Sequence, residues 1–195
     1  MLILGGGYGG VYAALKLQKA AKRGQIELSL VGQENFFLYQ PMLAEVVSGS
    51  IEPPHIINPI RRLLKYTKFH QAEIESVDAE SREVAIRYPG GHAHYSRIPY
   101  DHLVVAVGSS TDLSNLPGMA EHAFPFKTLG DAFALRNQLI GVLERAEVEN
   151  VVEERPDLLT FVVVGGGYTG IEVASYPSSL KIWPGSATSC WNAEA

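Results

Sequence analysis

The sequence predicts an α/β fold in which short apolar strands alternate with helices. Three observations support this prediction. Residues 1–31 read as strand, glycine-rich turn, helix and strand; residues 161–174 repeat the strand, the turn and the start of a helix; and 46% hydrophobic against 19% charged residues is typical of a globular chain. A length of 195 residues suits one ordinary domain or a domain and a half.

Composition and charge argue against several classes of function. The 16 Lys and Arg residues against 21 Asp and Glu give a formal net charge of −5, which argues against nucleic-acid binding. The single cysteine, Cys190, excludes an internal disulfide, a zinc cluster and a cysteine-pair redox centre and favours a reducing, cytoplasmic location. No apolar run approaches the roughly 18–20 residues that a membrane span requires, and the opening residues do not resemble a signal peptide.

The first strand–helix–strand unit gives the clearest local pattern. Residues 1–4 are apolar and lead into the glycine-rich residues 5–10. Residues 11–23 carry apolar side chains at helical spacing and cations near the end, where they favour a helix C-terminus. Gly24 follows as a helix-ending glycine, and the alternation over residues 26–31 predicts the second strand.

The middle of the chain is predicted to be less regular. Prolines mark residues 36–59 as mostly irregular, with one apolar segment at 42–47, and residues 60–66 predict a short helix. Residues 69–77 and 83–88 predict a β-hairpin, and residues 103–107 predict a buried strand that ends at Gly108. His92 and His94 follow a Gly-Gly turn without a carboxylate or thiol beside them, so we expect a solvated loop and no metal site.

The last predicted elements surround a second glycine-rich motif. A helix is expected from about Asp131, as its N-cap, to about Val148, and the β-branched residues 161–164 predict a strand. Residues 171–174 begin another helix, which Pro177 is expected to end. Residues 175–195 have no periodicity, and we interpret them as a frameshifted or misassembled tail.

Gly5, Gly7 and Gly10 have the G-x-G-x-x-G spacing of a dinucleotide-binding fingerprint. In this motif the first glycine permits a tight turn, the second lets the backbone approach a pyrophosphate, and the third lets helix and strand pack closely. The strand before it and the helix after it favour a Rossmann-like nucleotide site over a purely structural turn. Residues 165–170 repeat the motif 160 positions later.

The acid that normally bonds the ribose in such a site is displaced. It is expected about 20 residues beyond the motif, but Gly32 occupies that region and the nearest acid is Glu34. Either Glu34 reaches back from the loop, or the backbone and Gln33 replace it; otherwise Glu34 is a solvated loop charge.

Two fingerprints separated by a β-hairpin region resemble the two-dinucleotide flavoproteins, and most closely the type II NADH:quinone oxidoreductases. The resemblance covers about residues 1–174, and its most specific stretches are LILGGGYGGVYAALKLQKA, YDHLVVAVGSSTDLSNLPG and TFVVVGGGYTGIEVA. It implies that the first fingerprint binds FAD, that the second binds NADH, and that electrons pass from NADH through FAD to a quinone. The lack of a cysteine pair weighs against the disulfide reductases and sulfide:quinone reductases, whose folds are similar.

The resemblance also implies roles for individual residues. Ala106 and Gly108 resemble the family's A-T-G turn beside the flavin, with Val107 in place of the usual Thr, and Pro41 lies in a segment similar to one near the isoalloxazine. Glu172 resembles an acid near flavin and quinone and is the catalytic candidate, for proton handling; alternatively, it only favours the dipole in the first turn of its helix. The cofactor-binding candidates are Gly5, Gly7, Tyr8, Gly9, Gly10, Gln33, Glu34, Pro41, Ala106, Gly108, Gly165, Gly167 and Gly170.

These expectations divide the chain into a FAD-binding domain at 1–115 with a β-hairpin insertion, a connecting segment and helix at 116–157, the start of an NADH-binding domain at 158–174, and the tail at 175–195. The rest of the second domain and the family's peripheral membrane anchor are expected to be missing, so we expect a truncated enzyme that oxidises NADH poorly. The alternatives are a non-catalytic FAD- or nucleotide-binding remnant and a soluble NAD(P)-dependent dehydrogenase. The expected location is cytoplasmic, at the cytoplasmic face of the membrane for a full-length relative.

Overall fold

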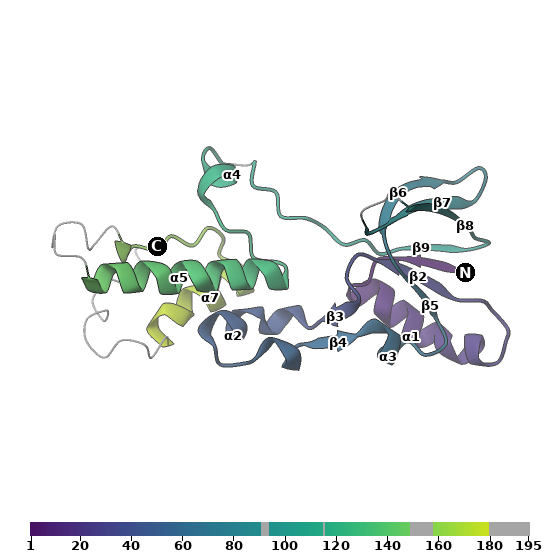
Figure 1. Ribbon diagram of the computed structural model, residues 1–195, viewed down its shortest axis with the longest axis horizontal. Helices are drawn as coiled ribbons and strands as arrows, with labels where there is room; N and C mark the ends of the chain where they lie inside the picture. The colour runs from purple at the N-terminus through teal and green to yellow at the C-terminus, as the bar shows by residue number, and fades with distance from the viewer. Residues whose placement is uncertain (91–93, 115, 149–157, 180–195) are drawn as a thin grey trace. The chain divides into compact units, whose positions relative to one another are not determined.

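A computed structural model describes residues 1–90, 94–114, 116–148 and 158–179 of the chain (Figure 1). The chain divides into two compact units. Unit 1 comprises Met1–Leu38 and Ile57–Ser110, and unit 2 comprises Tyr39–Ile56 and Thr111–Ala195. The domain boundaries expected from the sequence stay predictions.

A parallel sheet forms the centre of unit 1. Its strands, in spatial order, are β5 (Lys68–Gln71), β2 (Ser29–Gly32), β1 (Leu2–Leu4) and β9 (Leu103–Val105). All neighbouring pairs are parallel, and α1 (Tyr8–Lys22) is the crossover from β1 to β2 (Figure 1). The predicted strand–helix–strand unit and the α/β fold are confirmed.

The central strands are apolar because side chains cover both faces of the sheet. On one face, α1 packs its buried residues against the sheet, and this core includes Ile3, Val11, Ala14, Leu30 and Ile60. On the other face lies a second core, which includes Leu2, Leu4, Val31, Val84 and Ile86. β9 is an edge strand, so Val105 is 64% exposed. The predicted buried strand at 103–107 is therefore shorter and more exposed than expected.

An antiparallel sheet of β6 (Glu73–Asp78), β7 (Glu83–Tyr88) and β8 (His94–Pro99) supplies that second core. The single strand expected over residues 69–77 is wrong, because the chain passes from one sheet to the other at the buried Ala72, whose N–H donates to the Gly32 carbonyl. His94 begins β8, so the solvated loop expected there is also wrong for His94; His92 lies outside the described residues.

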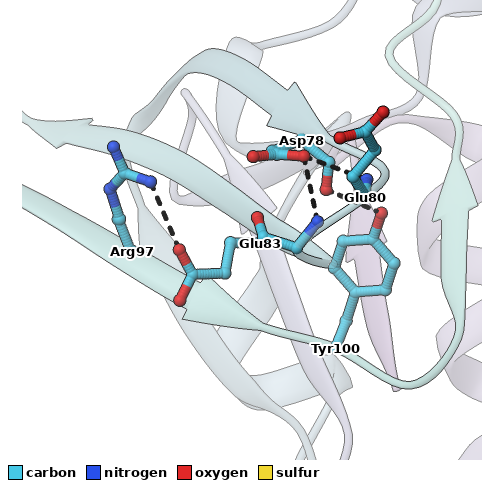
Figure 2. A network of polar contacts seen from close by, with 6 residues as sticks. Asp78, Glu80, Glu83, Arg97 and Tyr100 are labelled. Atoms are coloured by element: carbon cyan, nitrogen blue, oxygen red, sulfur yellow. Dashed lines mark hydrogen bonds and ion pairs between the residues drawn. The ribbon is translucent and has the colours of Figure 1, made fainter.

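The turn between β6 and β7 is closed by polar contacts (Figure 2). Asp78 Oδ1 accepts hydrogen bonds from the N–H groups of Glu80 and Ser81, at 2.9 and 3.0 Å. These donors lower the pKa of Asp78. Tyr100 Oη donates to the Asp78 carbonyl, and Arg97 pairs with Glu83 across β7 and β8. All of these contacts are exposed, and they hold the hairpin rather than form a site.

Unit 1 also contains a short antiparallel pair, β3 (Phe36–Leu38) and β4 (Ile57–Pro59), followed by α3 (Ile60–Leu63). The sequence predicts mostly irregular structure here because of the four prolines within residues 36–59. The pair forms nevertheless, since Pro59 is the last residue of its strand and needs no ladder N–H.

Unit 2 contains helices in its described part. They are η1 (Gln40–Met42), α2 (Leu43–Ser48), η2 (Pro53–His55), α4 (Met119–His122), α5 (Leu129–Val148) and α7 (Tyr168–Ser179). α2 packs against α5 and α7. None of the helices in the described ranges has the length and apolarity needed to cross a membrane.

Three predictions for unit 2 need correction. α5 begins at Leu129, and Thr128 rather than Asp131 caps it, because Thr128 Oγ1 accepts from the Asp131 N–H. Residues 161–164 form no strand, since no described strand of unit 2 is available to pair with them. α7 continues through Pro177 to Ser179. Proline has no backbone N–H, but only one helical hydrogen bond is lost, close to the end of the helix.

Candidate functional site

The first glycine turn joins β1 to α1, and two of its glycines are required by close backbone contacts. Gly5 has φ +109°, and a Cβ there would lie 2.0 Å from the Ala106 carbonyl oxygen. A Cβ on Gly10 would lie 1.8 Å from the Gly5 carbonyl oxygen. No side chain fits at either position, so strand, turn and helix pack as the fingerprint requires.

Gly7 differs from these two because it faces open space. A Cβ at Gly7 would meet nothing within 4 Å. Gly7 is also the N-cap of α1, no side chain caps the helix there, and its first turn contains no acid. The positive end of the helix dipole and backbone N–H groups thus face open space at Gly7. We call this open part of the first glycine turn, residues 5–10, the cradle. This is the arrangement that binds a pyrophosphate.

Two further segments of unit 1 border this cradle. At the end of β9, the Ala106 N–H donates to the Leu4 carbonyl at 2.8 Å, and Ala106 Cβ would lie 3.2 Å from a Cβ on Gly9. Gly108 follows with φ +77°. The structure therefore brings Ala106 to the glycine turn.

The other bordering segment is the loop after β2. A Cβ on Gly32 would lie 3.2 Å from the Gly6 nitrogen, and the Glu34 carbonyl oxygen lies 3.9 Å from the Cβ position of Gly6. Gln33 and Glu34 are both exposed. The displaced acid is thus on a loop beside the turn, while its contact with a ribose stays a prediction.

Sequence reasoning missed the aromatic contacts beside this turn. The Tyr8 ring stacks on Tyr12 with centroids 6.2 Å apart and meets Phe37 edge-on at 5.0 Å. The spacing of Tyr8 and Tyr12, four residues apart on a helix, predicts the first contact. The contact with Phe37 depends on β3, a strand that the sequence did not predict.

The second glycine turn reproduces the first. Gly165 has φ +118°, and a Cβ on Gly170 would lie 1.9 Å from the Gly165 carbonyl oxygen. The Ile171 N–H donates to the Gly167 carbonyl at 3.1 Å, as the Val11 N–H donates to Gly7 at 3.0 Å. A Cβ on Gly167 would meet nothing within 4 Å, so this turn also presents an open helix N-terminus.

The remaining candidates of unit 2 are exposed. Pro41 lies in η1, and Glu172 lies on α7. Because α7 begins at Tyr168, Glu172 is in the second turn, and the expectation that it stands in the first turn is wrong. A dipole role for this acid is therefore weaker, since the effect is confined to the first turn.

No metal centre is found among the residues that the structure describes: they contain no group of three His, Cys, Asp or Glu side chains that could hold an ion.

Comparison with known proteins adds relatives to this geometry. Residues 1–182 match the family described as pyridine nucleotide-disulphide oxidoreductase. The mitochondrial external alternative NAD(P)H-ubiquinone oxidoreductase B4 of Arabidopsis thaliana is 35% identical over 182 residues, which cover 90% of this chain and 31% of that protein. The type II NADH:quinone oxidoreductase Ndh of Mycobacterium tuberculosis is 33% identical over 183 residues, covering 92% and 38%.

A solved structure is similar as well. NDH2 from Plasmodium falciparum, in a complex with NADH, superposes with a TM-score of 0.81 at 28% identity, covering 92% of this chain and 36% of that one. The chain thus spans about a third of the length of the relatives that it matches.

Proposed function

Because the chain belongs to the pyridine nucleotide-disulphide oxidoreductase family, we propose that it is part of an FAD-dependent enzyme that oxidises NADH and reduces a quinone. The observation that carries this proposal is the pair of glycine turns with the same close contacts, Gly10 against Gly5 and Gly170 against Gly165. Two such turns suit one enzyme that binds two dinucleotides.

In this proposal the first turn holds FAD. Gly7 leaves space for the pyrophosphate, and the α1 N-terminus binds its charge. Glu34, or Gln33 together with the backbone, would contact the ribose. Ala106 and Gly108, at the end of β9, would lie beside the flavin. The turn fits a dinucleotide because Gly7, at the helix N-terminus, faces open space, whereas Gly5 and Gly10 are closely packed against backbone.

The second turn holds NADH by the same physical means. Gly167 is open in the same way as Gly7, and α7 begins at the following residue. When bound, FAD accepts reducing equivalents from NADH and delivers two electrons to the quinone. Glu172 would carry a proton, and Pro41 would pack near the flavin ring. A cytoplasmic location and association with a membrane surface stay predictions.

A matched pair of variants tests the assignment of the two turns. The Cβ of Gly7→Val lies at the proposed pyrophosphate position and meets no other protein atom within 4 Å, so we expect the chain to fold but to lose FAD. Gly167→Val makes the equivalent change in the second turn and is expected to leave FAD affinity unchanged. Flavin absorbance near roughly 450 nm after reconstitution reports binding, and circular dichroism reports folding.

Three outcomes would overturn the assignment. They are unchanged FAD affinity in Gly7→Val, equal loss of FAD in both variants, and a wild-type chain that takes up NAD but never FAD.

A further inference from the structure

The basic residues of unit 1 are concentrated in two stretches that the proposed reaction does not use. Residues 8–26 and 53–72 contain eight of the 16 Lys and Arg side chains and no Asp or Glu, although the whole chain is acidic. The eight cations are Lys16, Lys19, Lys22, Arg23, Arg61, Arg62, Lys65 and Lys68. All eight are exposed, and none forms an ion pair with a residue in the described ranges.

Three of these cations line a groove on the surface of unit 1. The C-terminal half of α1, the last residue of α3 and the segment after it border a shallow, open groove of about 270 Å³. Lys19, Lys22 and Lys65 line it, together with Tyr66. The groove lies at the opposite end of α1 from the first glycine turn, so it is separate from the proposed FAD cradle.

Gln18, which also lines the groove, connects its two sides by hydrogen bonds. Gln18 Nε2 donates to the Leu63 carbonyl and Gln18 Oε1 accepts from the Tyr66 N–H, both at 3.3 Å. One side chain thus ties α1 to the chain after α3. Lys22 Nζ lies 5.6 Å from the centroid of the Tyr66 ring, a cation–π distance that holds the ammonium at the groove wall.

Helix-dipole effects explain only part of this arrangement. Lys19 and Lys22 are in the last turn of α1, where cations are favourable. Lys65 is not on α1, so the dipole does not account for it. The last carbonyls of α1, at Ala20 and Ala21, already accept hydrogen bonds from the Gly24 and Gln25 N–H groups, which reduces their repulsion of an anion.

From these observations we propose that the groove binds a phosphate group. Three ammonium groups without counter-charges supply several N–H donors and a concentrated positive field, and lysine is a common ligand of phosphate. Carboxylates nearby would oppose such binding, and none of the residues that line the groove carries one. The phosphate belongs either to a free anion or to a lipid headgroup, and the two sources are separated by experiment.

The test compares the wild-type chain with a triple variant, Lys19→Gln, Lys22→Gln and Lys65→Gln. Titration with inorganic pyrophosphate, followed by calorimetry, examines the free anion. Both chains carry Gly7→Val and Gly167→Val in this arm, so that pyrophosphate binding at the two glycine turns is blocked. Co-sedimentation with vesicles of phosphatidic acid in phosphatidylcholine examines the headgroup. The control variant removes three cations elsewhere, as Arg82→Gln, Arg97→Gln and Arg145→Gln, so that the net charge changes equally.

We expect saturable binding of pyrophosphate or of phosphatidic acid vesicles, weakened at least about tenfold in the triple variant because each lost ammonium removes a charge-assisted hydrogen bond. The control should bind within a factor of about two of wild type. Binding of pyrophosphate identifies a free anion as the ligand, and binding of vesicles alone identifies a headgroup. No binding in either arm, or equal weakening in the triple and control variants, overturns the proposal.

Discussion

At the scale of single residues, His70 is the buried titratable group that links the two sheets of unit 1. It is 9% exposed on β5, and its Nδ1 lies 2.7 Å from Tyr88 Oη on β7. Burial, and secondly the charge of Lys68, lower the pKa of His70 below 6.5. The unfolded chain therefore binds a proton at a higher pH than the folded chain does, and this group's contribution to stability is lost as pH falls below 6.5.

This linkage predicts a change in the pH profile of folding. Urea unfolding measured from about pH 5 to 8 should show the wild type losing stability relative to His70→Gln as the pH falls, since Gln does not titrate. His102→Gln makes the same replacement at an exposed histidine and serves as the control. Parallel profiles for wild type and His70→Gln would contradict the prediction.

Glu34 carries the second prediction at this scale. If it contacts the adenosine ribose, Glu34→Gln removes a charge-assisted hydrogen bond and weakens FAD binding by about 1.5–3 kcal/mol. Titration of the chain with FAD measures this loss, and Glu144→Gln on α5 is the matched control. Unchanged affinity in Glu34→Gln would identify the acid as a solvated loop charge.

At the scale of elements, the start of α5 depends on a reciprocal pair. Thr128 Oγ1 accepts from the Asp131 N–H at 3.1 Å, and Asp131 Oδ2 accepts from the Thr128 N–H at 2.7 Å. Such a capping box satisfies two helix-terminal donors. Thr128→Ala and Asp131→Ala should each lower the free energy of unfolding by about 1 kcal/mol.

A double-mutant cycle checks this prediction. The double variant should lose less stability than the two single losses added, because either change already breaks the box. Thermal unfolding provides the measurement, with the exposed Asn137→Ala in the middle of α5 as a control. Additive losses would show that the two caps act independently.

Sequence patterns predicted the elements that local signals define, and they failed where a tertiary partner decides the structure. The periodicity of residues 11–23 and the glycine spacing anticipated α1 and both turns, since these depend on neighbours in the chain. The chain changes sheet at Ala72 because residues 68–71 pair with β2. Residues 161–164 do not form the predicted strand because no described strand of unit 2 pairs with them. In the site, the glycines were predictable, whereas the contact of Tyr8 with Phe37 was not.

At the scale of the whole molecule, the two glycine turns differ in what surrounds them. Gly5 lies against Ala106 of the neighbouring strand, but a Cβ on Gly165 would meet nothing within 4 Å. The segment before it is open as well: Val162 is 82% exposed and Val164 57%. On α7, Tyr168 is 90% exposed and Ile171 64%. All four are large apolar side chains exposed within residues 162–171, and no described strand pairs with residues 161–164.

Exposed apolar side chains promote self-association because contact between copies removes them from water, and backbone without a strand partner can form intermolecular strands. We therefore expect the 195-residue chain to form concentration-dependent oligomers. Val162→Lys together with Val164→Lys should shift it toward the monomer, since two charges oppose both effects. Sedimentation velocity over a range of concentrations measures the distribution.

The control for this last prediction is the equally charged pair Val77→Lys and Val148→Lys, at valines that are 44% and 72% exposed and lie away from the second turn in the sequence. Because those positions lie outside residues 161–164, the control should associate like the wild type. FAD affinity should be unchanged in both pairs, since neither alters the first turn. A wild-type chain that stays monomeric, or a control that dissociates equally, would show that residues 161–164 do not drive association.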